Sequence, residues 1–312
     1  MGMSQTTLIL AIDVSKDRLD CFAADSAEAF SLDNDAAGRT ALVKRCRTGG
    51  HLVALEASGG YERPLLRALC KAELPVRLLD PRRVRHFARA CGQWAKTDPL
   101  DARAIAAFAA AVPGPLHRPD AQAEALGELV TYRRQLIDAM TMLANQAEHL
   151  TNAELRRDAA RRIAAMKLRL AGLDRRILAA MDACPQLRRK AEIIRSIPGA
   201  GPILAATILA ELPEAGTLSR RAIAALVGVA PCDNKSGRRT RPASIRGGRP
   251  AIRSVLYMAA QIAARHNAHL ADFKARIRTR TTAPKVAIVA VMRKLIVLAN
   301  ALLRDNRTYA SA

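Results

Sequence analysis

Two short apolar runs, each ended by an acidic residue, constrain the fold of this chain more than any other feature. Leu8–Ile12 is followed at once by Asp13, and His51–Leu55 is followed by Glu56. Apolar runs of this length predict buried β-strands, each closed here by a carboxylate. The neighbouring sequence predicts further strands at 18–24, 27–32 and 76–79, and helices at 38–46, 61–72 and from residue 81. Together these elements predict an α/β domain with a mixed sheet.

A different pattern begins near residue 120. Apolar residues recur at heptad spacing in two series, Leu129, Leu136, Leu143 and Leu150, then Ile163, Met166, Leu170, Leu173 and Ile177. Such spacing predicts long helices that pack as a coiled coil. The partner helix is either in the same chain, as a helical hairpin, or in a second chain, as a dimer stalk.

The last third of the chain has a helical pattern punctuated by Gly and Pro, with a looser stretch at 231–250. Aromatic residues make up only 3% of the chain, while Ala and Leu supply most of its apolar content, which favours helices. The predicted fold class is therefore α/β plus all-α. We expect a catalytic domain at 1–118, a helical coiled-coil linker at 119–188 and a C-terminal domain at 189–312.

The charge balance indicates the kind of partner. The 312 residues carry 50 Lys+Arg against 28 Asp+Glu, a formal net charge of +22. Such an excess requires a polyanion or an acidic membrane as counterpart. No run of 18 or more apolar residues occurs, which argues against a spanning helix, and the N-terminal residues do not resemble a signal peptide. Six scattered cysteines suit a reducing cytoplasm. We therefore expect a cytoplasmic protein that binds nucleic acid and no membrane.

Four acidic residues form the main candidate catalytic group. Besides Asp13 and Glu56, the segment from Lys96 contains Asp98 and Asp101 at the start of an expected helix. A spacing of three residues puts both carboxylates on one helix face. A cluster of four acids is unfavourable unless divalent cations neutralise it, and oxygen ligands suit Mg²⁺ or Mn²⁺. The alternative is that Asp98 caps a helix and Asp101 interacts with its dipole.

Two further segments are candidates for phosphate binding. Gly199 and Gly201 open a helix, so backbone N–H groups there could hold a phosphate as in a helix–hairpin–helix element. The alternative is an ordinary helix corner. The second segment, 235–253, contains seven Lys or Arg and no acid, and its candidate nucleic-acid-binding residues are Lys235, Arg238, Arg239, Arg241, Arg246 and Arg249.

Ser236 and Ser244 lie in the same basic segment. A serine hydroxyl is a poor nucleophile until a base, a metal or a cationic pocket activates it. Chemistry alone therefore favours a phosphate-contacting role for Ser236 over a nucleophilic one. The chain has no phosphate-binding loop of the Gly-x-x-x-x-Gly-Lys-Ser/Thr type, which argues against ATP-driven work.

Five motifs in order resemble one family. They are Ile12-Asp13-Val14-Ser15-Lys16, Leu55-Glu56-Ala57-Ser58-Gly59, Lys96-Thr97-Asp98 with Asp101-Ala102, Ile197-Pro198-Gly199 with Gly201-Pro202, and Gly228 with Ala230-Pro231 and Ser236-Gly237. The chain resembles the DEDD-type transposases of bacterial insertion sequences, a family that also contains the Piv-type DNA invertases.

This resemblance implies an RNase H/RuvC-like domain with the catalytic and metal-binding tetrad Asp13, Glu56, Asp98 and Asp101, assisted by Mg²⁺. It implies a C-terminal transposase domain in which Ser236 attacks DNA covalently. It further implies a structured non-coding guide RNA and a homo-oligomer, either a dimer or a tetramer built from dimers. Two alternatives stay open: a RuvC-like nuclease that hydrolyses DNA without rejoining it, and a non-catalytic nucleic-acid-binding protein.

Overall fold

The computed structural model describes residues 8–92, 98–117, 120–236, 239–281 and 283–309; the side chains of 98–100 and 233–243 lie outside this description. The chain divides into two compact units, Met1–Pro119 and Asp120–Ala312, which we call unit 1 and unit 2.

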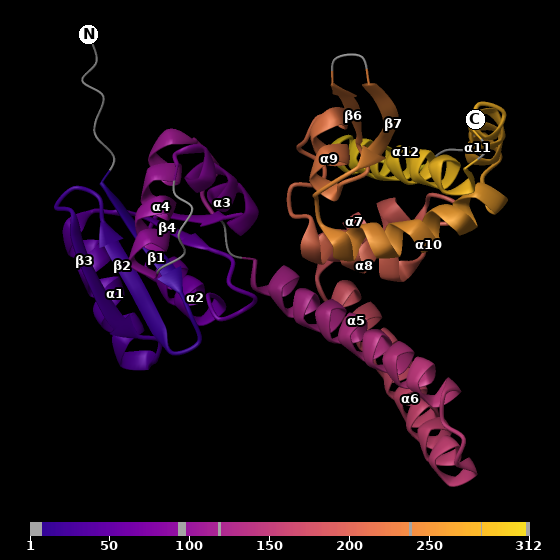
Figure 1. Cartoon of the computed structure of the whole chain (residues 1–312), viewed down its shortest axis with the longest axis horizontal. Helices are drawn as coiled ribbons and strands as arrows, with labels where there is room; N and C mark the ends of the chain where they lie inside the picture. The colour runs from indigo at the N-terminus through magenta and orange to yellow at the C-terminus, as the bar shows by residue number, and fades with distance from the viewer. Residues whose placement is uncertain (1–7, 93–97, 118–119, 237–238, 282, 310–312) are drawn as a thin grey trace. The chain divides into compact units, whose positions relative to one another are not determined.

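Unit 1 is built on a mixed five-stranded sheet with the strand order β3-β2-β1-β4-β5 (Figure 1). The pairs β3–β2 and β2–β1 are antiparallel, whereas β1–β4 and β4–β5 are parallel. In chain order its elements are β1 (Ile9–Val14), β2 (Arg18–Ala23), β3 (Glu28–Asp33), α1 (Ala36–Gly49), β4 (Leu52–Glu56), α2 (Arg63–Lys71), β5 (Val76–Leu79), α3 (Pro81–Ala90) and α4 (Asp98–Ala111).

The two faces of this sheet are covered by different helices. Because side chains alternate along a strand, Leu10 and Ile12 of β1 pack with α1 and α2, while Ile9 and Ala11 pack with α3 and α4. The predicted strands and helices of unit 1 are present, with ends shifted by a few residues. One shift matters for the site, since Asp13 lies inside β1 rather than after it.

Unit 2 is mostly helical. Its elements are α5 (Ala121–Glu148), α6 (Ala153–Ala183), α7 (Pro185–Arg195), α8 (Pro202–Glu211), α9 (Arg220–Val227), β6 (Pro231–Ser236), β7 (Arg239–Ile245), α10 (Pro250–His266), α11 (Ala268–Arg278) and α12 (Pro284–Arg304).

The heptad segments form a helical hairpin within the chain. Helices α5 and α6 pack along each other (Figure 1), and an ion pair of 2.6 Å joins Arg133 of α5 to Asp174 of α6. Asn152 caps the start of α6 by accepting hydrogen bonds from the backbone N–H groups of Glu154 and Leu155. Of the two arrangements that the heptads allow, the structure therefore contains the intramolecular one.

Helix α12 is the central apolar helix of unit 2. It is long and apolar enough to cross a membrane by length and composition, with a mean hydropathy of 2.1 over its best window. The search for 18 consecutive apolar residues in the sequence missed this helix, because Arg293 and Lys294 interrupt its apolar run. Half of that window is buried, and residues such as Val291 and Leu295 belong to the core that α12 shares with α7, α9 and α10. This environment is that of a core helix.

The stretch expected to be loose is a β-hairpin, so the expectation of an all-α C-terminal part is wrong there. Strands β6 and β7 pair antiparallel from Pro231 opposite Ile245 to Ser236 opposite Arg239, with an irregularity between Cys232 and Asn234. The apolar alternation that reveals a half-buried strand is missing because charged and polar residues dominate both strands.

Candidate active site

Asp13 and Glu56 occupy matching positions on neighbouring central strands. In the parallel pair β1–β4, Ile12 lies opposite Leu55, and the next residues along the two strands are Asp13 and Glu56. Strand alternation directs both carboxylates to the face that α3 and α4 cover. Both residues are half-buried. The two strand-borne acids predicted from the sequence are thus side by side.

Helix α4 lies over this face and carries the other two acids. It packs on β1, β2 and β4, and its residue Ile105 is fully buried there. Asp101 precedes Ile105 by one turn, so it shares the sheet-facing side of the helix, and it is half-buried. Asp98 is the first residue of α4, but its side chain lies outside the described residues.

The carboxyl group of Glu56 reports this crowding. Burial raises the pKa of Glu56, and the charges of Asp13, Asp101 and Asp80 raise it further, against a smaller opposing effect of Arg85. The resulting pKa is about 7, compared with an ordinary value of 4.5. Glu56 is therefore the point at which the acidic side chains of β1, β4 and α4 act on one another.

Asp80 is an acid near this site that the sequence reasoning missed. It follows β5 directly, just as an acid ends the run of β4, and this repeated pattern was the available signal. Its carboxylate also caps α3, accepting a hydrogen bond of 2.8 Å from the backbone N–H of Arg82. Asp80 thus has a structural role in addition to its effect on Glu56.

The donor set fits a hard divalent cation in chemistry. Crowded carboxylates, one of which has a raised pKa, are ligands that such a cation would deprotonate and hold. Among the described side chains, no group of three His, Cys, Asp or Glu is already arranged to hold an ion. The finding does not cover Asp98, whose side chain lies outside the described residues.

Arg77 fixes the far end of α4. This buried side chain of β5 donates a hydrogen bond of 2.7 Å to the carbonyl of Ala109 and another to the carbonyl of Val112. The last carbonyls of a helix have no partner inside the helix, and a cation is favourable at this end of the helix dipole. Arg77 therefore ties α4, and with it Asp101, to the sheet.

The basic hairpin of unit 2 carries the candidate nucleophile. Ser236 is the last residue of β6 and pairs with Arg239 of β7, while Lys235 pairs with Thr240. The side chains of these residues, and of Arg241, lie outside the described part, and so does Arg238 altogether. Arg246 is exposed just after β7.

Close backbone packing holds the base of this hairpin. Gly228 ends α9 and lies against Gly248, where a Cβ on Gly248 would come within 2.3 Å of the Gly228 nitrogen. Next to it, Arg249 forms two hydrogen bonds of 2.8 and 2.6 Å with the carboxylate of Glu214. Burial alone would raise the pKa of Glu214, but the hydrogen bonds and charge of Arg249 outweigh it and lower the pKa. A phosphate would have to compete with Glu214 for Arg249.

The two glycines before α8 differ in their surroundings. Gly199 has a φ of +92°, and a Cβ there would lie 2.3 Å from the Cα of Ala263 in α10. This close approach is sufficient reason for a glycine, without any ligand. Gly201 is exposed at the N-terminus of α8, and nothing lies within 4 Å of a Cβ built there. Of the two, Gly201 is the residue with room for a phosphate.

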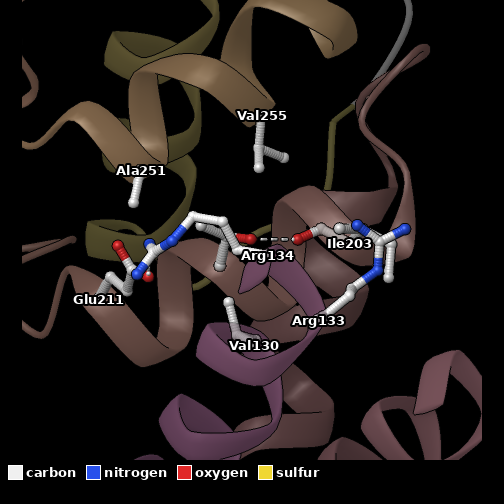
Figure 2. Close-up of a pocket in the computed structure, with 8 residues that line it drawn as sticks. Val130, Arg133, Arg134, Ile203, Glu211, Ala251 and Val255 are labelled. Atoms are coloured by element: carbon white, nitrogen blue, oxygen red, sulfur yellow. Dashed lines mark hydrogen bonds and ion pairs between the residues drawn. The ribbon is translucent and has the colours of Figure 1, made fainter. Parts of the chain in front are cut away.

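A pocket in unit 2 lies between α5, α8 and α10 (Figure 2). It has a volume of about 30 Å³, and its lining includes Val130, Ile203 and Val255. Figure 2 shows Arg134 reaching from α5 to Glu211 of α8, an ion pair of 3.0 Å. A cavity of this size holds a water molecule or two, far less than a small-molecule substrate needs. The pocket is therefore a small gap in the packing where the α5–α6 hairpin meets α8 and α10.

Family models of transposases match both units. A model described as "Transposase IS116/IS110/IS902 family" matches residues 191–275, and a transposase model of the IS110 DEDD type matches residues 10–153. These matches define the class of the protein as a transposase, a DNA-recombining enzyme. Within that class, the chain belongs to the IS116/IS110/IS902 family, which implies DNA as substrate and a general dependence on divalent metal ions.

Similar proteins carry names that agree with this class. A "Pilin gene-inverting protein" of Moraxella bovis is 26% identical over 98% of each chain. Its namesake of Moraxella lacunata is 27% identical over 83% of this chain and 81% of the relative. An uncharacterized 44.8 kDa protein of insertion element IS116 from Streptomyces clavuligerus is 29% identical over 58% of this chain and 47% of the relative.

Proposed function

We propose that this transposase cleaves and rejoins DNA with Ser236 as nucleophile, assisted by the tetrad Asp13, Glu56, Asp98 and Asp101. The observation that carries the proposal is the position of Asp13 and Glu56 on adjacent strands beneath α4, where Asp101 contributes to a Glu56 pKa of about 7. A cluster of acids in which one carboxyl group has a strongly raised pKa is typical of a functional site.

The four tetrad carboxylates would hold the divalent cation, for which we propose Mg²⁺, with Mn²⁺ as the alternative. When bound, such a cation supplies charge stabilisation for the oxygens that enter and leave at phosphorus. Without the cation, the raised pKa of Glu56 lets its carboxyl group keep a proton near pH 7, and this proton reduces the repulsion from Asp13 and Asp101. The roles of the individual carboxylates follow from their elements: β1 and β4 fix two of them, and α4 brings the other two.

In the proposed reaction the Ser236 hydroxyl oxygen attacks a DNA phosphorus. The new bond joins the serine oxygen to phosphorus, the bond to one strand oxygen breaks, and that oxygen takes up the proton that the serine gives up. Because one phosphoester replaces another, reversal with a different strand end rejoins DNA without ATP. Lys235, Arg238, Arg239 and Arg241 would bind the phosphates around Ser236, together with Arg246, Arg249 and the Gly199–Gly201 segment.

The name of the Moraxella relatives supports rejoining over hydrolysis, because inverting a gene requires that both ends be joined again. We further propose an RNase H/RuvC-like unit at 1–118, a linker at 119–188 and a transposase domain at 189–312 with a helix–hairpin–helix-like element. The remaining parts of the proposal are a guide RNA, a cytoplasmic location and a dimer or tetramer. Exposed Met142 and Leu155, near the turn of the α5–α6 hairpin, support contact between subunits.

The decisive experiment traps the protein–DNA adduct. Purified full-length protein is incubated with nicked DNA substrate and Mg²⁺, and the modified peptide is mapped by mass spectrometry. We expect the adduct on Ser236, its loss in Ser236→Ala, and its retention in Ser244→Ala with weaker binding. Cleavage that persists in Ser236→Ala, or an adduct on Ser244 or on a tyrosine, would overturn the serine assignment. Cleavage without rejoined products would favour the nuclease alternative.

A further inference from the structure

Arginines recur on α6 at seven-residue steps, in two neighbouring rows. The steps are Arg161 with Arg162, the exposed Leu168 with Arg169, and Arg175 with Arg176. We call these five arginines the basic ladder, and all five are exposed. Residues seven apart lie on nearly the same side of a helix, and the ladder spans about 22 Å at about 1.5 Å per residue.

The ladder is poorly neutralised within the chain. Between Ala159 and Leu173 the helix contains no acidic residue. Arg161 and Arg162 share the single carboxylate of Asp158. Among the described residues, Arg169, Arg175 and Arg176 form no ion pair, and the nearby Asp174 is engaged by Arg133 of α5.

Such a ladder does not help α6 to fold. Surface helices usually alternate opposite charges three or four residues apart, which adds a few tenths of a kcal/mol per pair, whereas like charges repel. Arg169 and Arg176 lie four and three residues from Leu173, which belongs to the core of unit 2, so this row of arginines borders the apolar side of α6. The charge is therefore a cost to the isolated hairpin, and an anionic partner would relieve it.

We propose that the basic ladder binds the phosphate backbone of duplex DNA. Helix α6 contains no aromatic residue, so it lacks the side chains on which the bases of a single strand stack. A length of about 22 Å corresponds to roughly six base pairs at about 3.4 Å each. The inference rests on the proposed function, since it takes DNA as the substrate, and it adds a second contact region apart from the β6–β7 hairpin.

The test compares two triple variants of the full-length protein that lose the same charge. The ladder variant is Arg169→Gln with Arg175→Gln and Arg176→Gln. The control variant is Lys44→Gln with Arg47→Gln and Lys71→Gln, which removes three exposed cations from α1 and α2 that form no ion pair among the described residues. Affinity for a labelled DNA duplex of about 30 base pairs, roughly three helical turns, is measured over a series of salt concentrations.

We expect the slope of log affinity against log salt to fall in magnitude by about 0.9 per lost contact, or roughly 2.7 for the ladder variant, and to stay unchanged in the control. The matching Arg→Lys triple variant should retain the slope, and circular dichroism should show that helicity is kept. An equal change in the ladder and control variants, or no change in either, would overturn the proposal. A change seen with duplex RNA but not with duplex DNA would overturn the choice of partner.

The same proteins are tested for rejoining of DNA. If the wild-type protein rejoins DNA and the salt slope of the ladder variant equals that of the wild type, the ladder proposal is wrong and the proposed function stands. If the ladder slope falls while the wild-type protein forms no rejoined product, the function fails and the binding surface stands.

Discussion

At the scale of single residues, the acids of the candidate site lower the stability of the folded state. Glu56 lies at the end of a central strand among other acids, and its pKa of about 7 means that the fold resists its ionisation. A group whose pKa is raised by folding stabilises the folded state least at high pH, because the unfolded chain gives up the proton more easily. The site therefore destabilises the folded state most at high pH, where Glu56 is ionised.

Removing the Glu56 charge should therefore stabilise the protein in a pH-dependent way. In the absence of divalent cations, Glu56→Gln should raise the melting temperature above pH 7 and have little effect below pH 4.5. Thermal unfolding of both proteins in the presence of a chelator, from below pH 4.5 to above pH 7, measures this difference in melting temperature. The same variant should lose all recombination activity. A gain in stability that is equal at both ends of the range would contradict the crowding of acids around Glu56.

Replacing Arg77 should loosen α4. Arg77→Met keeps much of the length of the side chain but leaves the carbonyls of Ala109 and Val112 without their donors. Each unsatisfied buried carbonyl costs about 1–3 kcal/mol. We expect faster hydrogen exchange in α4 and reduced recombination. Arg63→Met, which replaces the arginine at the start of α2, serves as the control; equal exchange in both variants would show that Arg77 does not hold α4.

Sequence reasoning singled out Asp13, Glu56 and Asp101, which the structure brings together, because each follows a local rule: an acid at a strand end or in a first helical turn. Asp80 and Arg77 were missed for different reasons. Asp80 obeys the strand-end rule but reads equally well as a helix cap, a role that it also has. Arg77 lies inside a strand of four residues, and only the tertiary structure shows that α4 ends over it.

At the scale of elements, the β6–β7 hairpin depends on the packing of its base. Gly248→Ala should disrupt that base, because Gly248 has a φ of +70° and its new Cβ would meet the backbone of Gly228. Gly247→Ala is a matched control, since its φ is +64° and a Cβ there has open space. Both variants incur about 1–2 kcal/mol of left-handed strain, but only Gly248→Ala adds a clash.

We expect Gly248→Ala to lose strand cleavage and to unfold at a clearly lower temperature than Gly247→Ala. Thermal melting and the adduct assay measure the two effects. Equal behaviour of the two variants would mean that the hairpin tolerates movement of its base.

Heptad spacing predicted the long helices but could not decide which chain supplies the partner helix, because both arrangements bury the same side chains. The hairpin within the chain follows from the short connection between Glu148 and Ala153, with its Asn152 cap. The β6–β7 hairpin was hidden because its pairing is specified by backbone hydrogen bonds rather than by an apolar face.

At the scale of the whole molecule, the two units should respond differently to divalent cations. The tetrad lies entirely within unit 1, so Mg²⁺ should stabilise that unit by about 2.7 kcal/mol at a hundred times its dissociation constant and leave unit 2 unchanged. Hydrogen exchange of the full-length protein with and without Mg²⁺ separates the two units. Protection confined to unit 2, or spread equally over both, would contradict a tetrad site. Asp13→Asn with Glu56→Gln should abolish the effect.

The position of α12 in the chain also sets the order in which the molecule acquires its parts during synthesis. Unit 1 is complete once the ribosome has released the residues up to Pro119, whereas the core shared by α7, α9 and α10 waits for α12, the last helix that the structure describes. Domains generally fold as they emerge, N-terminal first. A nascent chain thus gains its acidic pair well before the serine hairpin has a folded support. If Ser236 is the nucleophile, as proposed above, unfinished chains should be unable to cleave DNA.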